Sequence, residues 1–208
     1  MNILDIILHL DKYLNVIIQS LGLGTYLILF LVLFCETGLV ITPFLPGDSL
    51  LFTAGAIAAM GSLDLATLFL ALATAAIAGD SINYFIGKST GYRIAKGNTR
   101  LVKPEYIVRA QDFYARYGSI TIFLARFIPI VRTFAPFVAG IGEMKYTKFV
   151  SYNIFGGLVW TGLFLCGGYF FGNLPAVKQN FSVIILAIIF ISLLPAIIGF
   201  IQQKWAHD

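Results

Sequence analysis

Residues 125–136 read ARFIPIVRTFAP, an apolar stretch that contains two prolines and two arginines. Proline has no backbone N–H and clashes with the preceding helical turn, so one regular helix is not expected to run through Pro129 and Pro136. An arginine in apolar surroundings needs a counter-charge, a ligand or water. The stretch therefore predicts a broken helix that holds two positive charges, Arg126 and Arg132, inside the fold.

A second stretch of this kind precedes it, at residues 36–49, which read ETGLVITPFLPGDS. A carboxylate directly after a Pro-Gly pair is typical of the first turn of a helix, where it caps free N–H groups and suits the helix dipole. The stretch holds two acids and three helix breakers, namely Glu36, Asp48, Pro43, Pro46 and Gly47.

The composition predicts an all-α integral membrane protein. The chain is 59% hydrophobic and 12% charged with a mean hydropathy of +0.88, whereas a soluble domain is about 45–50% apolar. Mostly apolar runs at 65–87, 149–172 and 181–201 reach the roughly 20 residues that a span needs. Residues 1–23 mix charged and apolar side chains, which predicts an amphipathic helix at the membrane edge.

The positive charge is concentrated in residues 88–118, which contain seven basic and two acidic residues. Between spans, such a segment marks the cytoplasmic side by the positive-inside rule, and we prefer this interpretation to a nucleic-acid-binding patch. A last span at 181–201 then returns the C-terminus to the cytoplasm.

The two halves of the chain resemble each other. At an offset of 85 residues, six apolar or glycine positions of residues 24–87 match identical residues of 119–172. In each half a proline-interrupted segment precedes one clean span. The pairs are Phe52 and Phe137, Ala54 and Ala139, Gly55 and Gly140, Tyr84 and Tyr169, Phe85 and Phe170, and Gly87 and Gly172.

This layout predicts an inverted repeat. Freed backbone groups in hydrocarbon must be satisfied by protein or by water in a cavity, so each broken segment is expected to enter the membrane and turn back as a re-entrant hairpin. With one span after each hairpin, the second half is then upside down. Many secondary transporters have this plan, with the substrate site where the broken helices meet. A kinked bundle without a site is the simpler alternative.

If the hairpins face each other, acids of the first half meet arginines of the second. Guanidiniums suit phosphate or carboxylate, because their planar fork donates two hydrogen bonds to an oxyanion. Arg126 and Arg132 therefore bind a substrate, or form a structural pair with Glu36 and Asp48. A substrate that displaced those carboxylates would cause them to take up protons, which would couple proton movement to substrate movement. Asp80, inside the first clean span, either joins a proton path or bonds to a neighbouring helix.

Three motifs carry a family resemblance: Glu36 followed by PFLPGD at 43–48, GD at 79–80 with YFIG at 84–87, and RFIPIVRT at 126–133. Together they resemble the DedA family of bacterial inner-membrane proteins. The resemblance implies two re-entrant hairpins in inverted repeat and functional roles for Glu36, Asp48, Arg126 and Arg132. It also implies transport that depends on the proton-motive force, with undecaprenyl phosphate as the substrate of some members and phospholipids of others.

The leading hypothesis is a translocase of a phosphate-bearing lipid, with membrane lipids and protons as partners. A phospholipid scramblase or flippase, a proton-coupled antiporter of a small ion or drug, and a non-transporting assembly factor are the alternatives. An enzyme would need a nucleophile beside a base, and no His or Cys lies near the arginines in the sequence. We expect no metal, no cofactor and no nucleic acid; the oligomeric state is open, a homodimer included.

Overall fold

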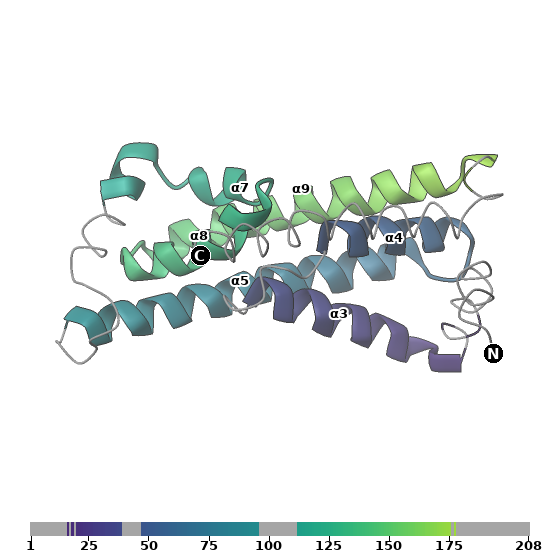
Figure 1. The fold of residues 1–208 in the computed structure, drawn as a ribbon, viewed down its shortest axis with the longest axis horizontal. Coiled ribbons are helices and arrows are strands. Elements are labelled where there is room, and N and C mark those ends of the chain that lie inside the picture. The colour runs from purple at the N-terminus through teal and green to yellow at the C-terminus, as the bar shows by residue number, and fades with distance from the viewer. Residues whose placement is uncertain are drawn as a thin grey trace, which may run out of the picture. The chain divides into compact units, whose positions relative to one another are not determined.

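The structure, a computed structural model, describes residues 20–38, 47–95 and 112–175, together with positions 16, 18 and 177. Among these residues the regular elements are helices and no strand occurs, which confirms the all-α class for this part of the chain. The helices are α3 (Leu23–Gly38), α4 (Gly47–Ala59), α5 (Leu65–Ala95), α7 (Thr121–Ala125), α8 (Pro129–Ile141) and α9 (Tyr146–Gly172) (Figure 1).

Several expected segments lie partly or wholly outside the described residues. They are most of the N-terminal helix at 1–23, the first break with Pro43 and Pro46, the middle of the basic segment 88–118, and the last span at 181–201.

Two helices are long and apolar enough to cross a membrane, over Leu65–Gly91 and Tyr146–Gly172. They match the clean spans predicted at 65–87 and 149–172. The first helix nevertheless continues to Ala95, past its predicted end. No proline occurs before Pro104 to stop it, and Gly87 and Gly91 lie against the backbone of α8 instead of ending the helix.

The start of α5 is set by a cap. The carboxylate of Asp64 accepts hydrogen bonds from the backbone N–H and the hydroxyl of Thr67, at 2.7 and 2.6 Å. The backbone N–H of Asp64 donates to the hydroxyl of Tyr26 at 2.8 Å. These bonds supply a partner for one of the N–H groups that every helix leaves free in its first turn.

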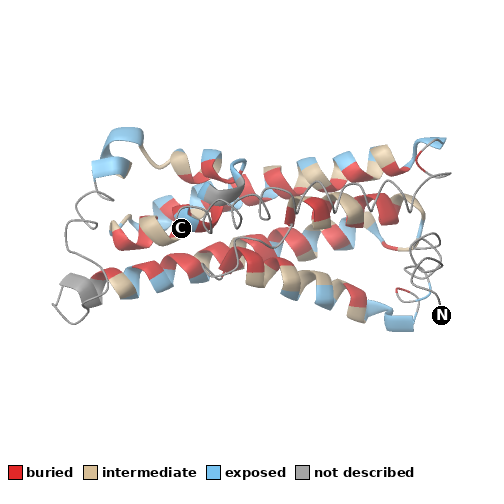
Figure 2. Ribbon diagram, in the orientation of Figure 1, coloured by how far each residue is buried: buried red, intermediate tan, exposed pale blue. Residues whose placement is uncertain are grey.

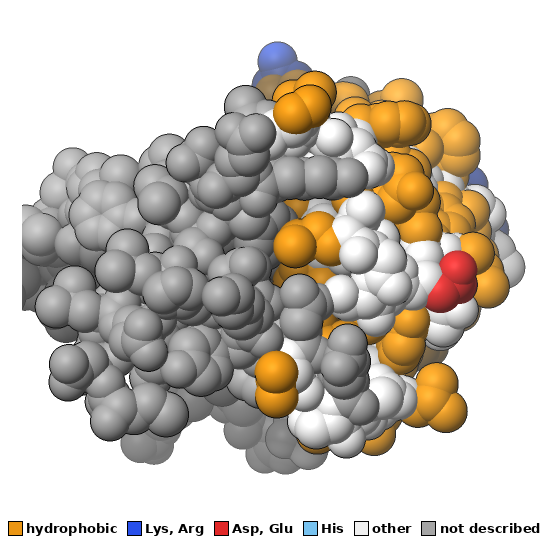
Figure 3. Space-filling view, turned by 90° about the vertical axis from the view of Figure 1, so that its right-hand side faces the viewer, with side chains coloured by type: hydrophobic (Ala, Val, Ile, Leu, Met, Phe, Trp, Pro, Cys, Tyr) orange, Lys and Arg blue, Asp and Glu red, His pale blue; other side chains and the backbone are white. Residues whose placement is uncertain are grey.

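Large apolar side chains are exposed along the described helices, for example Phe170 at 72%, Leu70 at 65% and Phe155 at 60%. Buried and exposed positions alternate along each helix (Figure 2). At one end of the molecule, hydrophobic side chains are spread over the described surface with few charged ones among them (Figure 3). Helices that are apolar on their outer as well as their inner faces suit a lipid environment better than water.

The chain divides into two compact units. The first contains residues up to 29, 44–70 and 162 onward, and the second contains 30–43 and 71–161. In the first unit, α4 packs on the C-terminal part of α9 with backbones in contact, since a Cβ at Gly55 would overlap Leu165 and one at Gly168 would overlap Phe52. A Cβ at Gly172 would come within 2.7 Å of Ala56.

The second unit contains an equivalent contact. We call this arrangement, in which glycines of two helices let their backbones touch, a glycine interlock. Here α8 packs on α5, where a Cβ at Gly140 would overlap the Tyr84 backbone and one at Gly87 would overlap Phe137. Phe52 and Phe137 are 85 residues apart, as the sequence comparison matched them, but Gly87 and Gly168 are 81 apart. The glycines of α5 and α9 that occupy equivalent packing positions are therefore 81 residues apart, whereas the sequence comparison aligned these helices at 85. The difference corresponds to about one helical turn.

Within the second unit α5 and α9 run antiparallel. The Asn153 amide donates to the Ile77 carbonyl at 3.0 Å, whereas the rings of Tyr84 and Phe149 stack at 4.6 Å between centroids. Rising residue numbers in α5 therefore meet falling numbers in α9. Around this contact lies a buried cluster composed of Tyr84, Ile122, Ala125, Ala135, Ala139 and Phe149.

The prediction of a break at Pro136 is wrong, because this proline lies inside α8. A proline removes one helical hydrogen bond and disturbs the carbonyls of the preceding turn. Here the amide of Asn83 donates to the Thr133 carbonyl at 2.7 Å, and the hydroxyl of Tyr114 donates to the Ala135 carbonyl at 2.8 Å. These tertiary bonds hold the turn of α8 that precedes the proline, and the helix continues through Pro136 to Ile141.

Gly87→Ala should destabilise the protein by roughly 1–3 kcal/mol, because the new methyl group would force α5 and α8 apart. Gly162→Ala is the matched control in another apolar helix, where the methyl group would meet only the Phe69 ring at an ordinary 3.5 Å. The control should be neutral or slightly stabilising. Unfolding in detergent, followed by circular dichroism, measures both, and equal stabilities would contradict the interlock.

Candidate functional site

The break between α7 and α8 positions two arginines. Helix α7 ends at Ala125 with Arg126 as its C-cap, the backbone at Ile128 is extended, and α8 begins at Pro129, where a missing N–H is tolerated. Arg126 and Arg132 stand on either side of this break and are only 4% and 8% exposed. Both charges are therefore inside the second unit.

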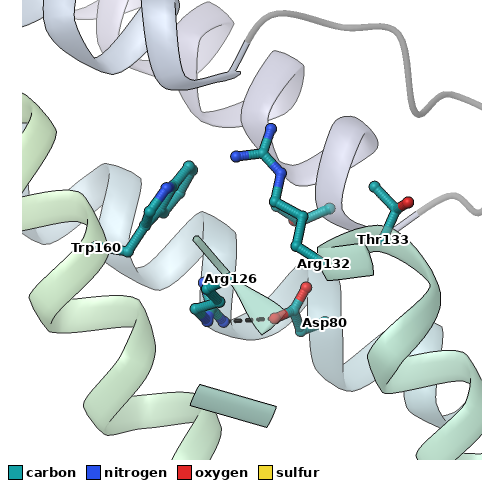
Figure 4. Close-up of a pocket in the computed structure, with 6 residues that line it drawn as sticks. Asp80, Arg126, Arg132, Thr133 and Trp160 are labelled. Atoms are coloured by element: carbon teal, nitrogen blue, oxygen red, sulfur yellow. Dashed lines mark hydrogen bonds and ion pairs between the residues drawn. The ribbon is translucent and has the colours of Figure 1, made fainter. Parts of the chain in front are cut away.

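Arg126 pairs with an acid of α5 and an amide of α9. Its guanidinium donates to the carboxylate of Asp80 at 2.5 Å (Figure 4). It also donates to the side-chain oxygen of Asn153. The amide nitrogen of Asn153 donates in turn to the Ile77 carbonyl. A side chain at Gly156 would come within 3.1 Å of Arg126, so this glycine leaves the space that the arginine fills.

Arg132 pairs with Glu36, which lies in the last turn of α3 and is 1% exposed. The end of α3 reaches this place because it approaches α5 at a glycine: a Cβ at Gly38 would lie 3.3 Å from the Gly79 Cα. An acid of the first half thus meets an arginine of the second, as expected from facing broken helices.

Trp160 of α9 lies beside both guanidiniums. Its ring centre is 4.9 Å from the guanidinium carbon of Arg132 and 6.0 Å from that of Arg126, and the residue is 1% exposed. Cations are attracted to an aromatic face, most strongly to that of tryptophan. The indole therefore provides an apolar wall that still stabilises two like charges close together.

These side chains line a small cavity of about 10 Å³, enclosed by Thr37, Asp80, Arg126, Arg132, Thr133 and Trp160 (Figure 4). Such a volume accommodates about one water molecule. A phosphate group does not fit unless the ion pairs separate. Electrostatically, two guanidiniums face two carboxylates, so the charges of the four side chains balance.

Asp48 does not line this cavity. It lies in the first turn of α4, in the first unit, and borders a larger cavity of about 250 Å³ with Ser49, Phe52, Phe164 and Phe171. Gly47 is the first residue of the same helix. The expected partnership of Asp48 with the arginines stays a prediction.

Sequence reasoning missed Asn153 and Trp160. The signal for Asn153 was present, since an amide inside a long apolar helix needs a hydrogen-bonding partner. No sequence signal separates Trp160 from an ordinary core aromatic. Among the described residues, no group of three or more His, Cys, Asp or Glu side chains is placed to hold a metal ion.

Comparison with known proteins identifies the family. The VTT domain family matches residues 45–170, which include Asp80, both arginines and Trp160. Protein DedA of Escherichia coli is 48% identical over 207 residues, 98% of this chain and 94% of DedA. The chain belongs to the DedA family.

Other relatives include an uncharacterized membrane protein of Mycobacterium tuberculosis, 42% identical over 81% of this chain and 75% of its own length. The inner membrane protein YghB of Escherichia coli is 35% identical over 74% of this chain and 71% of its own length. No solved structure matches this DedA-family chain.

Removing one member of an ion pair should be costly. Asp80→Asn leaves the buried Arg126 without its counter-charge and should destabilise the protein by about 3–5 kcal/mol in denaturant unfolding. Replacing both residues, Asp80→Leu with Arg126→Leu, should recover most of that stability, because no uncompensated charge remains. If the single variant were as stable as the unaltered protein, the pair would not be buried as described.

Proposed function

We propose that this chain is an inner-membrane transporter that moves a phosphate-bearing lipid such as undecaprenyl phosphate, with its movement linked to the proton-motive force. Membrane lipids and protons are its partners. The observation that carries the proposal is the pairing of two buried arginines with two buried carboxylates beside one small cavity in apolar helices.

The membrane location is supported by two kinds of observation. Two described helices are long and apolar enough to span, and large apolar side chains are exposed along them. The YghB relative carries the name of an inner membrane protein. We infer a multi-pass protein with the basic segment 88–118 and the C-terminus on the cytoplasmic side.

The arrangement of helices supports the inverted repeat. Two glycine interlocks of the same design, α4 on α9 and α8 on α5, involve corresponding parts of the two halves. The antiparallel course of α5 and α9 in the second unit is the relation that an inverted second half requires. In this proposal the two broken segments are re-entrant hairpins that enter from opposite sides.

The chemistry of transport follows from competition for the guanidiniums. A phosphate presents more negative charge and more acceptor oxygens than a carboxylate, so it can replace Glu36 and Asp80 as the partner of Arg132 and Arg126. The displaced carboxylates, left in apolar surroundings, take up protons. In this proposal Asp48 contributes a third proton-exchanging carboxylate. Release of the lipid on the other side reverses both steps.

In this proposal the site must open before a lipid headgroup binds. Since about 10 Å³ admits no phosphate, the lipid headgroup enters only after the arginine–carboxylate pairs separate. The fatty or isoprenoid chain of a lipid can remain in the bilayer while its headgroup passes the site. A lipid substrate therefore needs no large internal cavity for its apolar part.

Arg132→Ala should reduce the movement of undecaprenyl phosphate across reconstituted liposomes by at least about tenfold, because a hydrogen bond to a charged group contributes roughly 1.5–3 kcal/mol. Arg132→Lys keeps the charge but loses the planar fork, and should recover only part of the rate. The control is Arg116→Ala, which removes an exposed arginine whose guanidinium lies 5.6 Å from the Tyr117 ring.

The assay has clear contrary outcomes. Equal flux in the Arg132→Ala and Arg116→Ala proteins would remove Arg132 from the substrate site. Saturable uptake of a water-soluble ion or drug, without competition from lipid phosphate, would replace the lipid substrate by a soluble one.

A further inference from the structure

One side chain in the middle of α5 connects the end of α3 to α8. Asn83 is fully buried, and its amide nitrogen donates to the Thr37 carbonyl of α3 at 3.3 Å and to the Thr133 carbonyl of α8 at 2.7 Å. The two acceptors lie 46 and 50 residues from Asn83 in the sequence. All three residues belong to the second unit.

One of the two carbonyls lies where its helix cannot supply a donor. Thr37 is in the last turn of α3, and the final four carbonyls of any helix lack an intrahelical partner. Thr133 lies in the turn of α8 that precedes Pro136, and its carbonyl accepts the Asn83 amide at 2.7 Å. A buried carbonyl without a donor is costly in apolar surroundings, so the Asn83 amide satisfies the end of α3 and at the same time connects it to α8.

The two carbonyls are also next to the charged residues of the site. Thr37 follows Glu36, and Thr133 follows Arg132. The amide of Asn83 therefore holds the backbone on both sides of the Glu36–Arg132 ion pair. It does not line the cavity, and it reaches the pair only through the backbone.

We propose that Asn83 is a positioning residue that sets the register between Glu36 and Arg132 and thereby shapes the oxyanion site. The inference rests on the proposed function, because it concerns the geometry of the same site. Arg126 has a separate support, since Asp80 and Asn153 bind its guanidinium directly. Loss of the Asn83 amide should therefore act through Arg132 and leave Arg126 in place.

The first test measures binding of dodecyl phosphate to the full-length protein in detergent. The chain has two tryptophans, and in a Trp205→Phe background the fluorescence of Trp160 reports on the neighbouring guanidiniums. Asn83→Leu keeps nearly the same volume without a donor, and Asn83→Ala removes the side chain. Both should weaken binding by about tenfold, since a misplacement of about 1 Å at a site can cost as much or more.

Measuring the Asn83→Leu effect in other variants shows whether Asn83 positions Arg132 or only supports the fold in general. The Asn83→Leu effect should persist when Arg126 is replaced by lysine, and should shrink to less than about twofold in an Arg132→Ala background, where no Arg132 is left to position. Asn173→Ala removes an exposed amide that donates to the Tyr169 carbonyl at 3.1 Å, and should leave binding unchanged. If Asn83→Leu weakened dodecyl phosphate binding by the same factor in every background, or did not weaken it at all, the proposal would be overturned.

A second test does not depend on the proposed function. Glu36→Gln and Arg132→Lys form a double-mutant cycle in denaturant unfolding, which measures the coupling of the ion pair without any substrate. In the Asn83→Leu protein, or in Asn83→Ser if the leucine variant does not fold, this coupling should fall by about tenfold as an equilibrium constant. An unchanged coupling with lower overall stability would mean that Asn83 only joins helices, and would overturn the positioning role.

The two tests fail independently. If the unaltered protein neither binds dodecyl phosphate nor moves lipid phosphate, the proposed function is wrong, while the unfolding cycle still decides whether Asn83 positions the pair. If binding is intact but the cycle shows no change, the inference about Asn83 alone is wrong.

Discussion

A charged side chain in an apolar interior needs a partner, and the described structure is organised by that constraint. Arg126 and Arg132 are each matched by one carboxylate, Asp80 and Glu36, and the indole of Trp160 stabilises the two cations together. The partners come from α3 and α5, whereas the arginines come from the α7–α8 break. The helices must therefore meet at this point, because separating them would leave charges buried alone at a cost of about 3–5 kcal/mol for each broken pair.

Glycines bring the helices close enough for these pairs to form. Gly38 meets Gly79 where α3 reaches α5, Gly87 and Gly140 let α8 lie directly on α5, and Gly156 leaves room for Arg126. A second interlock of the same design occurs in the first unit. The site lies in the second unit, and it can change by moving α8 along its long neighbour α5. Such a movement would separate carboxylates from guanidiniums, which the proposed transport requires.

The sequence predicted the two described long helices, the break at Pro129 and the meeting of an acid of the first half with an arginine of the second, because apolar length, proline and charge each leave a local signal. It did not predict that Pro136 stays helical, since the donors that support its neighbours come from Asn83 and from the Tyr114 hydroxyl, both distant in the chain. Nor could it select Asp80 as the partner of Arg126. Which carboxylate pairs with which arginine depends on distances in three dimensions, and composition and sequence spacing do not contain these distances.

The central claim is that a substrate phosphate takes the place of carboxylates on buried arginines. Its most direct test is the number of protons exchanged on binding, measured by titration calorimetry of undecaprenyl phosphate into the detergent-solubilised protein in buffers of different ionisation enthalpy. The account predicts net uptake of about one proton or more, because displaced carboxylates in apolar surroundings become neutral, and less uptake in the Glu36→Gln protein. Tight binding without any proton uptake would contradict it.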